Sequence, residues 1–250
     1  MREDMRRALL ESYTIRKEAG IRQSWSGNPD MGSRGEVTSR KHLDRVAEIV
    51  SGDIASMGIG RGDIVGNGEA VIPGWFRASK RWDVLAFHGG QLVAAVELKS
   101  ISGSYGKNLN NRVEEALGEA QDASYAVKKD LLNRVIPPLL CYAMIVKKEE
   151  ESEKTADMPR RGRFGYDPVF DDTSYLDRFR IACERMRLEG IYGAVWFVTV
   201  DPVRGTVEEP VPELSYEAFL SEIRGRAGSF LNRFDDRLSM RNMFPTADFF

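Results

Sequence analysis

Two stretches of the chain are apolar without interruption, and each predicts a strand buried on both faces. Residues 139–146 read LLCYAMIV, and residues 193–200 read GAVWFVTV. Runs of this length without alternating polar positions are typical of central strands in a sheet that helices cover on both sides. A third apolar region, residues 81–100, holds two strand-like runs, 83–87 and 92–98, around the turn sequence HGGQ. It predicts an antiparallel hairpin.

Apolar positions at helical spacing predict the helices around these strands. The clearest helix is the segment 110–135, in which Val113, Ala116 and Ala120 fall on one face, and Pro137-Pro138 follows it as a stop signal. Further helices are predicted at residues 3–19, from 38 or 39 to about 50, at 174–189, at 214–224 and at 228–241, and a short strand at 63–65 or 70–72.

The order of these elements predicts an α/β fold. A helix, a hairpin, a long helix, a buried strand, a helix and a second buried strand imply a mixed β-sheet flanked by helices on both faces. No repeat and no clear linker divides the chain. Residues 1–250 are therefore interpreted as a single domain, with an exposed, charged insertion near 147–171 and a helical C-terminal region.

Composition and charge narrow the class of protein only a little. The chain is 42% hydrophobic and 30% charged, which is ordinary for a globular domain. No apolar run approaches the roughly 20 residues of a membrane helix, and the N-terminus lacks the apolar core of a secretory signal, so we expect a cytoplasmic protein with no membrane partner. The net charge of −2 leaves room for a local positive cleft that binds nucleic acid.

Three charged residues stand at one end of the apolar hairpin: Asp83 begins its first run, and Glu97 and Lys99 end its second. A two-residue turn at Gly89-Gly90 places Asp83 opposite Val96. A three-residue loop or a β-bulge places it opposite Glu97 instead, and the three charges then share one face.

Two carboxylates this close together favour a cation between them. Mg²⁺ fits, because it takes oxygen ligands and is commonly held by one or two carboxylates. Such an ion could support phosphodiester hydrolysis, with Lys99 positioning or helping to deprotonate the attacking water. The hairpin alone allows a second interpretation, a solvated cluster of salt bridges.

Asp83 followed by Glu97-Leu98-Lys99 after an apolar strand resembles the PD-(D/E)xK nuclease motif, with Trp82 in place of the proline that often precedes the aspartate. Four blocks between about residues 27 and 146 resemble, in order, the XhoI-type restriction endonucleases: GSRGEVTSRKHLD, RWDVLAF, LVAAVELKS and SYGKNLNNRVEEALGEAQD. The resemblance implies a restriction-endonuclease-like fold and a homodimeric type II enzyme. Such an enzyme cuts double-stranded DNA with Mg²⁺ at a palindrome of the CTCGAG type, leaves 5′-phosphate ends, and requires a host DNA methyltransferase for protection.

Roles for single residues follow from the same resemblance. Asp83 and Glu97 are expected as metal ligands, together with the Leu98 carbonyl, and Lys99 as the catalytic lysine. Asp44 or Glu48 could supply an auxiliary carboxylate. Contacts to DNA are expected from Arg34, Lys41, Asn108, Asn110, Asn111 and Arg112. Helix capping and surface solvation explain the asparagines nearly as well. Glu36 and Ser39-Arg40 depart from the family pattern, which leaves the target sequence open.

Two other functions fit the same residues. One is a repair or structure-specific nuclease on the same fold. The other is a non-catalytic DNA-binding protein in which the three charges form only a salt-bridge cluster. That second alternative predicts no dependence on a divalent metal and little effect of Glu97→Ala beyond stability.

Overall fold

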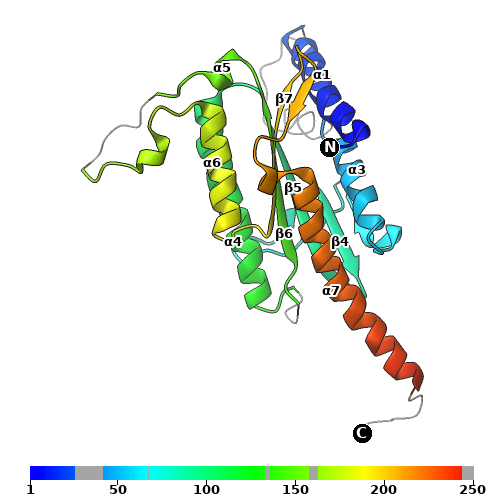
Figure 1. The fold of residues 1–250 in the computed structure, drawn as a ribbon. Helices are drawn as coiled ribbons and strands as arrows, with labels where there is room; N and C mark the ends of the chain where they lie inside the picture. Colours follow the sequence, from blue (N-terminus) through cyan, green and yellow to red (C-terminus); the bar gives the residue numbers. More distant parts are fainter. Residues whose placement is uncertain (26–41, 67, 133–135, 158–162, 244–250) are drawn as a thin grey trace.

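The computed structural model has a six-stranded mixed sheet at its centre and helices on both faces of the sheet (Figure 1). It describes residues 1–25, 42–66, 68–132, 136–157 and 163–243, without the side chains of 16–25 and 234–243. The helices are α1 (Glu3–Trp25), α3 (Asp44–Ala55), α4 (Tyr105–Lys128), α5 (Glu150–Glu153), α6 (Tyr175–Leu188) and α7 (Tyr216–Met243). The strands are β1 (Ile64–Val65), β2 (Val71–Ile72), β3 (Lys80–Arg81), β4 (Val84–His88), β5 (Gln91–Ile101), β6 (Leu139–Lys147), β7 (Ala194–Asp201) and β8 (Thr206–Glu208).

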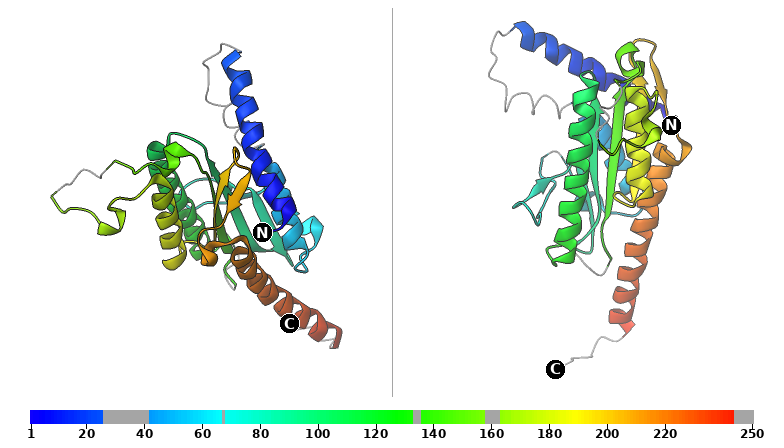
Figure 2. Two further views of the ribbon diagram at one scale, coloured as in Figure 1. Left: turned by 45° about the horizontal axis from the view of Figure 1, so that its top comes forward. Right: turned by 90° about the vertical axis from the view of Figure 1, so that its left-hand side faces the viewer.

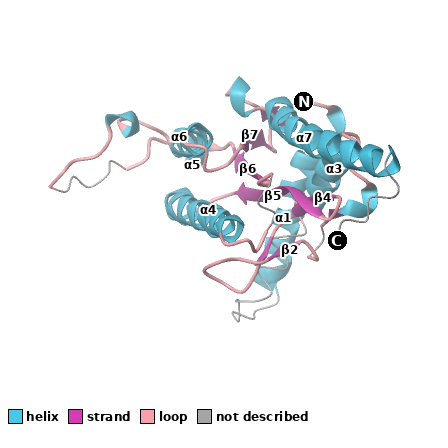
Figure 3. Ribbon diagram, turned by 90° about the horizontal axis from the view of Figure 1, so that it is seen from below, coloured by secondary structure: helices cyan, strands magenta, loops and turns pink. Residues whose placement is uncertain are grey.

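The strand order in the sheet is β1-β4-β5-β6-β7-β8, and β2 and β3 form a separate two-stranded ribbon. β4 and β5 are the antiparallel hairpin, whereas β5, β6 and β7 run parallel. Parallel neighbours need crossover connections, and α4 and α6 supply them. These two helices cover one face of the sheet, while α1, α3 and α7 cover the other (Figures 1 and 3). The expected α/β fold is confirmed.

The central strands are apolar throughout because each of their faces meets a different helical layer. In β6, Cys141, Ala143 and Ile145 pack with α1, α3 and α7. Tyr142 and Met144 point the opposite way, toward α4 and α6. Successive side chains of a strand alternate between faces, so a strand covered on both sides has no solvent-facing position for a polar residue.

Four helices differ from their expected bounds. α1 continues to Trp25, beyond the expected end at 19, and α3 spans Asp44–Ala55 where the pattern predicts a helix from 38 or 39 to about 50. The other two, α4 and α7, show why. α4 begins at Tyr105, five residues before the expected start, because the Tyr105 ring is buried and its hydroxyl donates to Glu149 at 2.6 Å. At the other end of the chain, α7 is one helix where the pattern predicts two. Ala227 is buried between Ile223 and Phe230, so one apolar stripe continues across the expected break.

Of the expected insertion at 147–171, the described residues 150–157 and 163–171 include α5 and lie at the side of the molecule, next to α6 (Figures 1 and 2). Its first part is anchored, since Ser152 and Ala156 are buried, whereas Phe164 is 97% exposed. Within the described ranges, every helix is too short or too polar to cross a membrane.

Candidate active site

The register of the β4–β5 hairpin brings the two carboxylates of the motif opposite each other. Gly89 and Gly90 form a two-residue turn with φ values of 56° and 73°, the positive values that such tight turns require. A β-bulge then adds Val93 to β5, because Ala86 pairs with Ala94 while Phe87 pairs with Leu92. Val84 consequently faces Val96, and Asp83 comes to stand opposite Glu97. The bulge, not a three-residue loop, produces this register.

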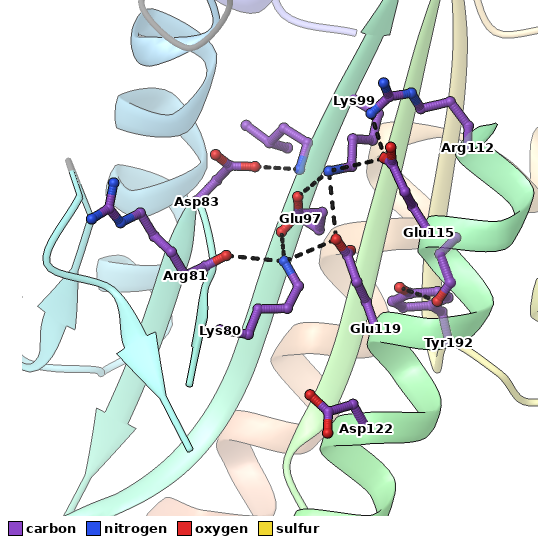
Figure 4. Close-up of polar contacts among 12 residues, drawn as sticks. Lys80, Arg81, Asp83, Glu97, Lys99, Arg112, Glu115, Glu119, Asp122 and Tyr192 are labelled. Carbon is purple, nitrogen blue, oxygen red and sulfur yellow. Dashed lines mark hydrogen bonds and ion pairs between the residues drawn. The ribbon is translucent and has the colours of Figure 1, made fainter. Parts of the chain in front are cut away.

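Glu97 and Lys99 interrupt the apolar face of β5 that packs toward α4. Their neighbours on that face, Ala95 and Ile101, belong to the core beneath α4 and α6. Glu97 is only 6% exposed, and both of its oxygens are engaged. Lys80 of β3 donates to Oε2 at 2.7 Å, and Lys99 donates to Oε1 (Figure 4). Burial of a carboxylate requires such partners.

Helix α4 adds two more acids to the cluster. Glu115 and Glu119 are four residues apart and therefore lie on one face of the helix, the face turned toward β5 (Figure 4). Glu119 Oε1 lies 3.2 Å from Lys80 Nζ and 3.7 Å from Lys99 Nζ. Glu115 lies 3.9 Å from Lys99 Nζ and also pairs with Arg112. Lys80 and Lys99 thus form ion pairs with three carboxylates, those of Glu97, Glu115 and Glu119.

Asp83 sits beside this network and binds the backbone. Its Oδ2 accepts a hydrogen bond of 2.6 Å from the Leu98 N–H. The N–H and C=O of a strand residue point to the same edge, so the Leu98 carbonyl faces the Asp83 side as well. There Trp82 leaves the β4–β5 ladder, since its N–H donates to the Ala70 carbonyl at 2.8 Å. Oxygen atoms of Asp83 and Leu98 therefore converge at the end of the hairpin.

The charges at the site are unevenly balanced. Burial would raise the pKa of Glu97, but Lys99 and Lys80 outweigh burial and hold it below its usual value. Burial would lower the pKa of Lys99, but Glu97 and Glu119 hold it above its usual value, so the ammonium persists. Asp83 lacks comparable support: burial and the nearby Glu97 raise its pKa to about 6. A surplus of negative charge therefore collects at Asp83.

The residues present fit a hard divalent cation. Among the described residues, His, Cys, Asp and Glu side chains form no ready-made set of three metal ligands. The donors at the hairpin end are instead two carboxylates, Asp83 and Glu97, and the Leu98 carbonyl. Mg²⁺ is usually held by one or two carboxylates, with water and phosphate oxygens completing the shell. A cation there would also offset the negative charge that raises the pKa of Asp83.

Asp83 opens onto a hollow of about 290 Å³ between α3 and the start of β4. Glu48, Ser51 and Arg61 also line it, and Asp44 does not. A larger hollow, of about 1000 Å³, lies at the ends of β6 and β7. Its wall includes Glu149, Glu150, Glu151, Glu153 and Asp201. Lys148, Lys154 and Arg204 line it too, so acids exceed bases by two, and the balance of charge disfavours a polyanion such as DNA.

The candidate DNA contacts fall into three groups. Arg34 and Lys41 lie outside the described residues. Asn110 and Asn111 are exposed near the start of α4. The side chains of the remaining two have internal partners: Asn108 donates to the Gly103 carbonyl at 2.7 Å, and Arg112 pairs with Glu115.

Sequence reasoning missed Lys80 and Glu119. Glu119 had a usable signal: it follows Glu115 by one helical turn, on the first helix after the motif. Lys80 had none, because β3 has only two residues and a strand that short carries no periodic pattern. Its contact with Glu97, 17 residues away, depends on how the β2–β3 ribbon folds against the sheet.

A mixed sheet with crossover helices, carrying a buried carboxylate–lysine cluster at the end of its hairpin, is a restriction-endonuclease-like fold. The sequence model of the family described as restriction endonuclease XhoI matches residues 22–209. The chain belongs to this family.

Relatives in the family are type II restriction enzymes. The chain is 33% identical over 194 residues to the type II restriction enzyme XhoI of Xanthomonas vasicola, covering 72% of this chain and 78% of that one. It is 34% identical over 200 residues to the type II restriction enzyme BstVI of Geobacillus stearothermophilus, covering 76% and 89%. The type II restriction enzyme AbrI of Azospirillum brasilense is 34% identical over 151 residues, covering 60% and 68%. No solved structure gives a significant match.

Proposed function

We propose that the protein is a Mg²⁺-dependent type II restriction endonuclease. It hydrolyses both strands of double-stranded DNA at a palindrome of the CTCGAG type and leaves 5′-phosphate ends. The observation that carries the proposal is the register of the hairpin, which sets Asp83 opposite Glu97 with Lys99 on the same strand, in a chain of the XhoI family.

Asp83, Glu97 and the Leu98 carbonyl would hold the metal ion. When bound, Mg²⁺ polarises the scissile phosphate and stabilises the charge that develops on it. Lys99 keeps its proton beside Glu97, so its ammonium orients the attacking water and a phosphate oxygen. Lys80 of β3 and Glu119 of α4 hold Glu97 and Lys99 in place. Glu48 is the better candidate for the auxiliary carboxylate, because it shares the hollow with Asp83.

Each chain has one such site. Cutting both strands of a palindrome therefore favours two chains related by a two-fold axis, and the proposal includes a homodimer. The enzyme acts in the cytoplasm, where a cognate DNA methyltransferase protects the host's own sites without binding this chain.

The test is cleavage of unmethylated phage DNA by the wild type, with Mg²⁺ or with EDTA, beside Glu97→Ala. Glu153→Ala is the matched control, since it removes an exposed glutamate on α5. We expect discrete fragments with Mg²⁺ from the wild type and the control, and a loss of roughly 100- to 1,000-fold or more in Glu97→Ala. Sequencing of the fragment ends gives the target and the end chemistry.

A smear in place of fragments would replace sequence-specific cleavage with a non-specific or structure-selective nuclease. Absence of cleavage by a folded wild type on several DNAs would overturn the enzyme assignment and favour the non-catalytic DNA-binding alternative. Sedimentation measures the number of chains. The homodimer is refuted if the protein alone has the mass of one chain and its complex with DNA also contains one chain per duplex.

A further inference from the structure

An aromatic and basic tip lies next to the candidate active site. It consists of Trp75, Phe76 and Arg77, at the end of the ribbon formed by β2 and β3, and is called the 75–77 tip. Trp75 is 45% exposed and Phe76 is 69% exposed, whereas Trp82 and Trp196, the other described tryptophan side chains, are buried. Large exposed aromatic side chains on a soluble protein commonly mark an interaction site.

A buried carboxylate fixes the shape of the tip. The side chain of Asp122 on α4 is only 4% exposed. Its Oδ1 accepts hydrogen bonds from the backbone N–H groups of Trp75 and Phe76, each at 2.7 Å, and its Oδ2 accepts one from Arg77 Nε at 2.6 Å. The backbone comes so close that a Cβ on Gly74 would lie 2.4 Å from Asp122 Oδ2. Burying a carboxylate is unfavourable unless its partners are fixed, so this arrangement preorganises the tip.

The tip and the active site share one face of α4. Glu115 and Glu119 pair with Lys99 at the active site. Asp122 follows Glu119 by three residues on the same side of the helix (Figure 4). Further along this face, Tyr125 packs edge-on against Phe76 with ring centroids 5.2 Å apart. Lys129 Nζ lies 5.0 Å from the centre of the Trp75 ring. The chain continues from the tip directly into Lys80 of the cluster.

The exposed charge around the tip is mainly positive. Arg77 is 44% exposed, and Lys128, Lys129 and Arg81 are also exposed. The negative charge of Asp122 is buried and paired, while Asp130 follows the two lysines. Exposed cations between exposed aromatic rings match a nucleic acid, in which phosphates alternate with sugars and stacked bases.

We propose that the 75–77 tip, with Lys128 and Lys129, binds the DNA duplex beside the scissile phosphate. The cations contact phosphates, and Phe76 and Trp75 pack against the sugar or base of a neighbouring nucleotide. Because Asp122 fixes the tip to the same helix that holds Glu119, the contact sets where the duplex lies relative to Glu97. This inference rests on the proposed function as a DNA endonuclease.

The test is binding of a fluorescent duplex containing CTCGAG, measured by anisotropy in EDTA so that no strand is cut. Phe76→Ala should weaken binding roughly 5-fold or more, the effect of losing one aromatic anchor from an interface. The double variant Lys128→Gln, Lys129→Gln should make the slope of log K against log salt shallower by about 1 to 2, one for each phosphate contact.

Matched controls lie on other parts of the surface. Val203→Ala removes an apolar side chain that is 91% exposed on the β7–β8 turn, and Lys154→Gln removes an exposed lysine after α5. Both should bind DNA as the wild type does. The altered side chains lie at the surface, so every variant should remain folded, and melting curves measured in parallel check this.

The outcomes separate this inference from the proposed function. Unchanged affinity and salt slope in folded tip variants, with a wild type that binds and cuts the duplex, would overturn the tip's role alone. A change in sedimenting mass without DNA, together with unchanged affinity, would identify the tip as a contact between copies of the chain and would equally refute the proposal. A wild type that binds no duplex in EDTA and cuts none with Mg²⁺ would overturn both.

Discussion

Glu97 and Asp53 are both buried carboxylates, 6% and 8% exposed, yet their surroundings differ. Asp53 of α3 has one donor for each oxygen: Arg2 Nη1 lies 2.5 Å from Oδ1, and the Tyr216 hydroxyl lies 2.6 Å from Oδ2. Those contacts join the start of the chain, α3 and α7 across one layer. Glu97 shares its two lysines with Glu119, and it faces a second carboxylate, Asp83. Among the described residues, no lysine lies at hydrogen-bond distance from Asp83.

The difference separates a structural ion pair from a site held ready for a ligand. At Asp53 the donors match the acceptors, so nothing further is needed for stability. At the hairpin end, the carboxylates that the structure describes outnumber the lysines, and the excess charge lies beside the Leu98 carbonyl. Sites of this kind reduce the stability of the free protein in return for binding or catalysis. This contrast between the two carboxylate sites leads to three predictions about cleavage and stability, given from the largest expected effect to the smallest.

The largest effect is expected on cleavage when the charge of Lys99 is removed. Lys99→Met keeps an unbranched apolar side chain, and Lys80 still covers Glu97, so the fold should persist. Turnover with Mg²⁺ should fall by roughly 100- to 1,000-fold, because an oriented cation at the scissile phosphate is lost. Single-turnover cleavage of a labelled duplex measures the chemical step apart from binding.

Lys148→Met is the matched control for Lys99→Met. Lys148 also pairs with two acids, Glu208 at 2.8 Å and Glu153 at 3.9 Å, but it lies just after β6, outside the cluster around Glu97. The Lys148→Met variant should cleave DNA at the wild-type rate. Equal losses in the two variants would mean that any ion-paired lysine matters to this fold, and the assignment of Lys99 to catalysis would be wrong.

The sequence predicts the elements around Glu97 and Asp53 unequally well. The two central strands follow from their apolar runs, because a strand between two helical layers has no polar face. The break expected in α7 is absent, since Gly225 and Gly228 disfavour a helix locally while burial of Ala227 and Phe230 sustains it. Tertiary packing overrides local propensity in such places.

The site itself could be predicted only in part. Glu97 and Lys99 are two residues apart on one strand, so their shared face follows from the pleat. Asp83 joins them only through the Val93 bulge, which the sequence offers as one of three hairpin arrangements. Lys80 depends on the position of the β2–β3 ribbon, a contact between segments that local patterns do not describe.

The second prediction concerns the sign of the change in stability. Besides its effect on cleavage, Asp83→Asn should raise the melting temperature in EDTA at about pH 8, because it removes an unbalanced buried charge and keeps an oxygen for the Leu98 N–H. Asp53→Ala should do the opposite. It leaves the buried Tyr216 hydroxyl without its acceptor, which costs roughly 1–3 kcal/mol and about 2–4 °C per kcal/mol in a chain of this size.

Calorimetry of both variants with and without Mg²⁺ checks this. Mg²⁺ should raise the melting temperature of the wild type and of Asp53→Ala, and should lose that effect in Asp83→Asn, because a ligand that binds only the folded state stabilises it. If Asp83→Asn is less stable than the wild type in EDTA, the carboxylate is a structural element like Asp53, and the proposed division between the two sites fails.

The smallest effect is expected at Asp122, which resembles Asp53 in its matched donors but lies next to the catalytic cluster. Burial would raise its pKa, but hydrogen bonds from Arg77, Phe76 and Trp75 outweigh burial and hold it below its usual value of 3.8. The folded state therefore binds this proton more weakly than the unfolded state. The stability that Asp122 contributes is present above the unfolded pKa and is lost as the pH falls through the lower, folded pKa.

Asp122→Asn should consequently melt below the wild type at about pH 6, and the gap should shrink as the pH falls below about 4. Melting curves across this range measure the gap, with Glu69→Gln, an exposed acid near β2, as the variant that should show none. A gap independent of pH would mean that Asp122 supports the 75–77 tip by shape and not by charge. The conformation of the 75–77 tip would then be independent of the ionisation of Asp122, and it would persist at a pH below about 4.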